Sequence, residues 1–141
     1  MTKLEEMLLG FQIPKVAKVR QKLDRTRVED LEGYLTGRLR SKELPIRRGD
    51  RIAVTGGSRG IADYPRVMKT AVDYIKERGG IPFIVPAMGS HAGGTAEGQA
   101  AMLRDLGIAE ESVGAPIVSS MEVVEVARPE LGLPVYIDRN A

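Results

Sequence analysis

The hydrophobic and polar positions of this chain form short apolar runs separated by longer periodic stretches. The runs at Arg51–Thr55 and Ile81–Val85 are bounded by turn-forming residues, and they predict two buried strands. Between them, apolar side chains recur every three or four positions over Val67–Ile75, which predicts an amphipathic helix. Pro65 suits the first turn of this helix and Gly79-Gly80 ends it, so the pattern begins as strand–helix–strand.

Two further helices are expected on either side of this unit. Thr26 and Glu29 have the spacing of a capping box, and the apolar residues near them lie on one helical face: Val28, Leu31, Leu35 and Leu39. Thr95 can cap a helix over Ala96–Leu106, which a glycine ends. The segment Ile13–Leu23 fits either a helical stripe or an exposed edge strand.

After Ile108 the pattern changes to short apolar runs separated by turns, which predict strands at Pro116–Val118, Met121–Val126 and Val135–Ile137. Alternating strands and helices favour a parallel sheet with right-handed crossovers. The predicted fold is a Rossmann-like α/β domain: a mostly parallel sheet with flanking helices and extra short strands at its C-terminal end. The length of 141 residues indicates one domain, residues 1–141. The sequence ends in a predicted strand and a polar turn, which suggests that this domain is the N-terminal part of a larger protein.

The amino-acid composition says little more about the fold, but it excludes several kinds of chemistry. Hydrophobic residues make up 43% of the chain and charged residues 28%, as is typical of a globular domain. No apolar run approaches the roughly 18 residues that span a bilayer, and the first ten residues lack the apolar core of a secretory signal. We therefore expect a cytoplasmic protein. The absence of cysteine and the single histidine exclude disulfides, thiolate catalysis and metal sites built from Cys or His clusters.

Basic side chains crowd one short segment near the N-terminus. They are Lys15, Lys18, Arg20, Lys22, Arg25 and Arg27. Such a cluster suggests nucleic acid as a partner. However, the chain has no Trp, two Phe and four Tyr, which leaves few platforms for base stacking. We therefore expect a solvated or interface surface there, and docking of a partner through this segment ranks behind the functions considered next.

Two glycine-rich loops follow the predicted strands, at the sheet edge where open α/β folds bind ligands. The first, Thr55–Ile61, looks like the glycine fingerprint of short-chain dehydrogenases, but Ala62 replaces the final glycine and no acidic residue follows the next strand. Its glycines free backbone N–H groups, Ser58 offers a hydroxyl, and Arg59 offers a guanidinium. The loop therefore predicts an anion site for phosphate or carboxylate, with a plain strand–helix turn as the simpler alternative.

The second loop, Gly89–Thr95, contains the only histidine of the chain, His91. A lone histidine is more often structural than catalytic. The neighbouring side chains are, however, too small to bury an imidazole, and the loop follows the carboxyl end of a predicted strand. His91 is therefore a candidate acid/base, because an imidazole can exchange a proton near neutral pH.

Taken together and in this order, the two loops resemble the N-terminal domain of the nickel-pincer-dependent lactate racemase family. The residues that carry the resemblance are Ile81–His91, Thr95–Gln99, Ser119–Val124 and Pro134–Ala141. The resemblance covers most of this chain but only the N-terminal part of a complete family protein. The Gly-Ser-His segment is fairly specific to the family, whereas the Gly-Gly-Ser-Arg-Gly loop is not.

The resemblance implies an isomerase, a racemase or epimerase of 2-hydroxy acids. In this family a tethered nickel-pincer nucleotide accepts a hydride from the substrate, and a histidine removes the hydroxyl proton. His91 matches the first of the two catalytic histidines. Arg59 falls where the family has an arginine that contacts the cofactor phosphate in an Asp-x-Thr-Arg-Pro loop, and Ser58 replaces the threonine. Gly57, Ser58, Arg59 and Gly60 are thus expected to bind the cofactor.

The departures from the family pattern also carry expectations. Gly56 replaces the aspartate of that loop and Gly60 its proline, which suggests a 2-hydroxy acid other than lactate. In the family, the tethering lysine, the nickel-ligating histidine and the second catalytic histidine lie beyond the region matched here. We therefore expect the chain alone to be inactive, with no cofactor tethered to it, and to work with a missing C-terminal domain. The apolar face that would meet this domain favours a homo-oligomer when the chain is isolated. The alternative is a non-catalytic module that binds an anion or nucleotide through the Gly56–Gly60 loop.

Overall fold

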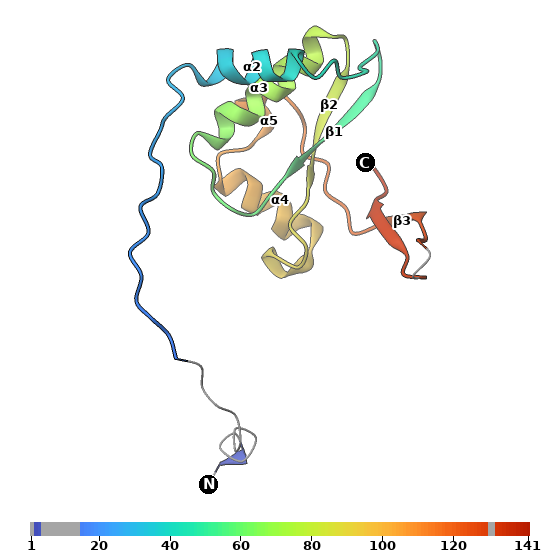
Figure 1. Ribbon diagram of the computed structural model, residues 1–141. Helices are drawn as coiled ribbons and strands as arrows, with labels where there is room; N and C mark the ends of the chain where they lie inside the picture. Colours follow the sequence, from blue (N-terminus) through green and yellow to red (C-terminus); the bar gives the residue numbers. More distant parts are fainter. Residues whose placement is uncertain (1, 4–14, 130–131) are drawn as a thin grey trace.

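The computed structural model describes residues 2–3, 15–129 and 132–141 of the chain. In chain order, its elements are α2 (Leu31–Arg40), β1 (Arg51–Gly56), α3 (Tyr64–Glu77), β2 (Ile81–Pro86), the short helical turn η1 (Ala92–Gly94), α4 (Ala96–Asp105), α5 (Glu110–Val113), β3 (Val123–Ala127) and β4 (Val135–Asp138) (Figure 1). The predicted strand–helix–strand–helix order is confirmed, and the protein belongs to the mixed α/β class. Within the described part of the chain, no helix has both the length and the apolar character needed to cross a membrane.

The strands β1 and β2 form a parallel pair. Their register runs without a shift from Arg51 opposite Ile81 to Gly56 opposite Pro86. Where the sequence predicts a strand over Pro116–Val118, the structure has one parallel bridge, which pairs Ile117 with Ile84. Both strands are rich in β-branched and apolar residues, and β2 is buried at Pro82 through Val85, which explains why its pattern reads as a continuous apolar run.

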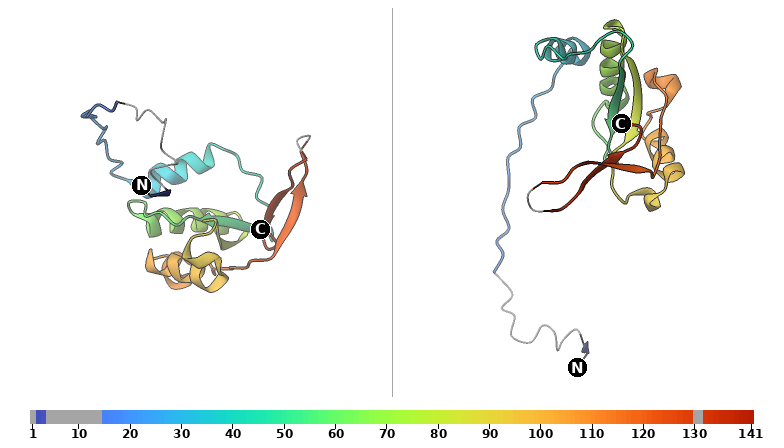
Figure 2. Two further views of the ribbon diagram at one scale, coloured as in Figure 1. Left: turned by 90° about the horizontal axis from the view of Figure 1, so that it is seen from below. Right: turned by 90° about the vertical axis from the view of Figure 1, so that its right-hand side faces the viewer.

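The two C-terminal strands form a sheet of their own. β3 and β4 pair antiparallel, with a register shift between Glu125 and Ala127. Strands predicted at Met121–Val126 and Val135–Ile137 are therefore confirmed with slightly different bounds. This hairpin projects from the body of the protein, away from the helices (Figures 1 and 2). All of its strand residues except Asp138 are exposed.

The hydrophobic core forms around α3, which contacts β2 and α5, while α4 packs against β2. Its buried side chains are Tyr64, Met68, Val72, Ile84, Met88, Leu103, Ile108, Val113 and Ala115. The helix α2 and the pair α4–α5 lie on opposite sides of α3 (Figure 2). Burial of these side chains is the main stabilising contribution, because each large apolar side chain removed from water contributes roughly 1.5–3 kcal/mol.

The predicted ends of two helices are confirmed by their contacts. Pro65 lies in the first turn of α3, where its missing N–H costs no hydrogen bond. The hydroxyl of Thr95 accepts a hydrogen bond from the backbone N–H of Gly98 at 3.1 Å and so caps α4. Gly107, just after α4, has a φ of 81°, a left-handed conformation that glycine adopts without strain.

The predicted capping box of Thr26 and Glu29 is wrong. α2 is capped by Asp30, whose carboxylate accepts a hydrogen bond from the N–H of Gly33 at 2.9 Å. The hydroxyl of Thr26 instead donates to the carboxylate of Asp24 at 2.6 Å, in a local turn that competes with helix formation. Val28 consequently precedes the helix and is 49% exposed.

Residues 15–28 contain neither helix nor strand and run away from the body as an extended, exposed segment (Figure 1). The helix or edge strand predicted for Ile13–Leu23 is therefore wrong from residue 15 onward, and residues 13 and 14 lie outside the described residues. The physical reason is that Val16 and Val19 have no apolar surface to pack against: they are 92% and 82% exposed.

Candidate functional site

The candidate site lies where β1 and β2 end. Because the two strands are parallel and stay in register to their last pair, Gly56 and Pro86, the loops that follow them leave from the same edge. Gly56 itself is buried against the helix α4. A Cβ on this residue would lie 2.8 Å from Cδ2 of Leu103, whose side chain is fully buried. The role of Gly56 is therefore close packing beneath the loop rather than ligand binding.

The structure brings the two predicted loops into direct contact. The hydroxyl of Ser58 and Nδ1 of His91 form a hydrogen bond, although the residues are 33 positions apart in sequence. The His91 side chain is exposed, as its small neighbours predict, and Ser58 is half-buried. The two chemical groups singled out in the sequence thus form one constellation at the edge of the parallel sheet.

Several hydrogen-bond donors of the first loop remain available. The backbone N–H groups of Ser58, Arg59 and Gly60 bond to none of the described residues, and neither does the exposed guanidinium of Arg59. Gly57 differs, because its N–H donates to the hydroxyl of Tyr64 at 2.8 Å. Of the four residues predicted to bind a cofactor, three therefore offer donors to a ligand, while Gly57 fixes the path of the loop. Consecutive free N–H groups beside a guanidinium favour an anion.

A surface pocket of about 510 Å³ adjoins these donors. It is lined by Thr55, Gly57, Ser58, Arg59, Ile61, Tyr64, Val67, Met68 and Ala87. Its size falls in the range of small-molecule sites, and it combines apolar side chains of α3 with the polar loop, as such sites do. His91 is not among the lining residues, but its imidazole hydrogen-bonds to Ser58, which is.

The loop that carries His91 is held from below by Gln99, which lies on α4 and is only 4% exposed. Its side-chain amide donates to the carbonyl oxygen of Gly89 at 2.7 Å and to that of His91 at 3.4 Å. The N–H of Gly94 donates to the same His91 carbonyl at 3.0 Å. These contacts fix the backbone at His91, so the position of the ring depends mainly on its side-chain torsions and on Ser58.

Sequence reasoning missed Tyr64 and Gln99 as parts of the site. Gln99 has a weak signal, because it stands four residues after the cap Thr95 on the face of α4 that also carries the buried Ala100 and Leu103. A polar side chain on such a face needs a partner, and here the partner is the loop backbone. Tyr64 gives no comparable signal, because a tyrosine at the start of a helix is compatible with plain core packing.

The residues present fit only one end of a nickel-pincer nucleotide. Ser58, Arg59 and Gly60 offer the donors that a phosphate group requires. Among the described residues, however, no three or more His, Cys, Asp or Glu side chains form a group that could hold a metal ion. The described residues thus offer donors suited to the anionic end of such a cofactor and no group of ligands for its nickel.

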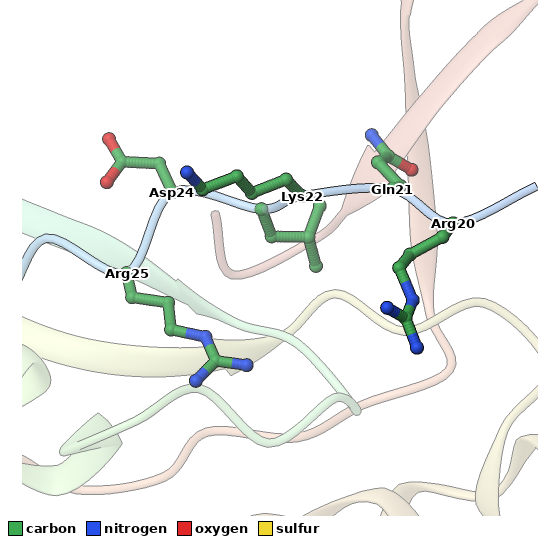
Figure 3. A pocket seen from close by; sticks show the side chains of 6 residues that line it. Arg20, Gln21, Lys22, Asp24 and Arg25 are labelled. Carbon is green, nitrogen blue, oxygen red and sulfur yellow. The ribbon is translucent and has the colours of Figure 1, made fainter.

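A hollow of about 910 Å³ lies elsewhere and has a different character. Six consecutive residues of the extended N-terminal segment line it: Arg20, Gln21, Lys22, Leu23, Asp24 and Arg25. Their charged ends do not converge on a common point (Figure 3). Since one exposed stretch of chain supplies the whole lining, this hollow lacks the walls that position a ligand.

No protein-family model matches this chain, and neither curated proteins nor solved structures include a significant match. The function must therefore come from the geometry and chemistry of the site.

Proposed function

We propose that this chain is the N-terminal, Rossmann-like domain of a cytoplasmic 2-hydroxy-acid racemase or epimerase similar to lactate racemase. In this proposal, His91 is the acid/base, and Ser58, Arg59 and Gly60 bind the phosphate of a nickel-pincer nucleotide. The hydrogen bond between Ser58 and His91 carries the proposal, because it joins a proton-exchanging group to a cluster of anion donors at one sheet edge.

Each residue has a defined task in this reaction. The planar guanidinium of Arg59 binds a phosphate or carboxylate through two parallel hydrogen bonds. The exposed imidazole of His91 accepts the proton of the substrate hydroxyl as the carbon–hydrogen bond breaks, and returns it after the hydrogen has been restored to the opposite face. When bound, the nickel-pincer nucleotide would supply the hydride acceptor, and its nickel ligands would come from a C-terminal domain.

The test is racemisation by the complete enzyme. The chain is combined with the C-terminal domain of such an enzyme and loaded with the cofactor, and several 2-hydroxy acids are assayed by chiral chromatography. Replacing His91 by alanine should lower kcat by at least about a hundredfold, the usual contribution of a general acid/base. Ser90→Ala is the matched control, because Ser90 is the exposed neighbour of His91 and hydrogen-bonds to none of the described residues. A His91→Ala enzyme that racemises at the parental rate would reject the proton-transfer role.

A second candidate function is a non-catalytic anion- or nucleotide-binding module. The observation that favours it is that the N–H groups of Ser58, Arg59 and Gly60 bond to none of the described residues and the guanidinium of Arg59 is exposed. An anion site built from these donors would need no further domain. Titration calorimetry with inorganic phosphate, mononucleotides and NAD(H) tests this directly. Tight binding by the chain alone, weakened at least about tenfold by Arg59→Ala, the loss expected for a charge-assisted pair, would favour the module.

A further inference from the structure

The two nitrogens of the His91 ring have different surroundings. Nδ1 shares a hydrogen bond with the hydroxyl of Ser58, whereas no described residue bonds to Nε2. We propose that Ser58 is a positioning residue for His91: its hydroxyl fixes the imidazole in the tautomer that leaves Nε2 as the proton-accepting nitrogen. This inference rests on the proposed function, in which His91 exchanges a proton with the ligand.

The hydrogen bond to Ser58 is the one contact among the described residues that restrains the His91 ring. Gln99 and Gly94 hold the carbonyl of His91, so the backbone beneath the ring is fixed. The ring itself is exposed, and among the described side chains only Ser58 hydrogen-bonds to it. Removing the Ser58 hydroxyl would therefore free the ring to rotate while leaving the loop in place.

The chemistry of a hydroxyl explains how a bound anion selects the tautomer. A serine hydroxyl has one hydrogen to donate and lone pairs with which to accept. When a phosphate binds beside Arg59, the Ser58 hydroxyl donates its hydrogen to the anion, and its oxygen can then only accept from Nδ1–H. The proton of a neutral imidazole thus resides on Nδ1, and Nε2 is left as the base. Filling the anion site consequently prepares His91 for proton abstraction.

The single histidine of the chain makes this arrangement directly measurable. Long-range proton–nitrogen NMR spectra of the isotope-labelled chain report the protonation of each ring nitrogen without any activity assay. The spectra are recorded at a pH high enough that the ring signals no longer change with pH, so they report the tautomer alone. We expect saturating inorganic phosphate to shift the parental ring toward the Nδ1–H form.

The decisive variants are Ser58→Ala and Ser58→Thr, both with phosphate present. Ser58→Ala should lower the ratio of the Nδ1–H to the Nε2–H form about fivefold, as expected for the loss of one ordinary hydrogen bond. Ser58→Thr keeps the hydroxyl and should restore the parental ratio, and Ser90→Ala should leave it unchanged. The backbone amide spectrum of each variant shows whether the loop is still folded.

Two results would overturn the inference: an unchanged tautomer ratio in Ser58→Ala, or a parental ring whose nitrogen signals ignore saturating phosphate. The second measurement needs no variant, so it decides the matter even if Ser58→Ala does not fold. These failures differ from failure of the proposed function, which would be shown by a His91→Ala enzyme that racemises at the parental rate. Ser58 could orient an imidazole that has no part in racemisation, and His91 could act without help from Ser58.

Discussion

At the scale of single residues, neighbouring glycines of the first loop have different physical roles. Gly56 is buried, and an added Cβ would collide with Leu103 and approach Ile84 at 3.4 Å. Gly57 would carry a Cβ into open space, and its φ lies outside the left-handed region. The sequence shows two equivalent glycines, because the difference between them comes from a helix nearly fifty residues further along the chain.

This difference predicts opposite outcomes for the same substitution. Gly56→Ala should lower the free energy of unfolding by about 1–3 kcal/mol, because the extra methyl overpacks a rigid core. Gly57→Ala is the matched control and should change it by less than about 0.5 kcal/mol. Urea denaturation followed by circular dichroism measures both. Equal stability of the two variants would contradict the packing role of Gly56.

At the scale of elements, a bidentate ion pair links α2 to α3. The guanidinium of Arg66 donates from Nε and Nη2 to the two carboxylate oxygens of Glu32, each at 2.8 Å. This hydrogen bonding, more than the accompanying charge attraction, lowers the pKa of Glu32 below its ordinary range. The same partner raises the pKa of Arg66. Both side chains are about half exposed, so solvent screening keeps the contribution small.

The sign of the pH dependence follows from the lowered pKa of Glu32. The stabilisation is present above the unfolded-state value, about 4.3, and is lost as the pH falls through the lower folded-state pKa. Urea midpoints measured across this acid range should therefore decline with falling pH, and Glu32→Gln should remove a small part of that decline. Asp73→Asn is the control, because Asp73 pairs with Lys69 within α3 and does not join two elements. Identical pH profiles for Glu32→Gln and the parent would contradict the linkage.

The elements that the sequence predicts well are those whose signals are local. β1, β2 and the Thr95 cap need only a short window of sequence to be recognised, and they are confirmed. The predicted start of α2 is wrong because two aspartates offer local hydrogen bonds. Asp24 binds the hydroxyl of Thr26 and Asp30 binds the N–H of Gly33, and small energy differences between such contacts decide where the helix begins. Ser58 and His91 are both identifiable from the sequence, but their contact depends on strand pairing, which no local pattern specifies.

At the scale of the whole molecule, stability is unevenly distributed. The core around α3 contains side chains with no exposure, including Val72, Ile84 and Leu103. In the β3–β4 hairpin, by contrast, apolar side chains are largely exposed: Val123 by 58%, Val126 by 50% and Tyr136 by 52%. A two-stranded hairpin without a packed face is marginally stable in water. The hairpin should therefore open far more often than the parallel pair.

Hydrogen exchange measures this difference directly. Backbone amides of β3 and β4 should exchange with solvent much faster than those of β2, because local opening of the hairpin requires no disruption of the core. The amides of β2 should exchange only through opening of the core. Equal protection of the two sheets would contradict the marginal stability of the hairpin.

The unbroken register of β1 and β2 has a consequence for how the site can be lost. A displacement of one strand along the other by a single residue would carry its loop about 3.3 Å, farther than a hydrogen bond can stretch. The contact between Ser58 and His91 thus depends on the register of β1 and β2. Inserting one amino acid into either strand would separate Ser58 from His91 without changing either residue. The pairing of the strands therefore sets the distance on which the chemistry depends.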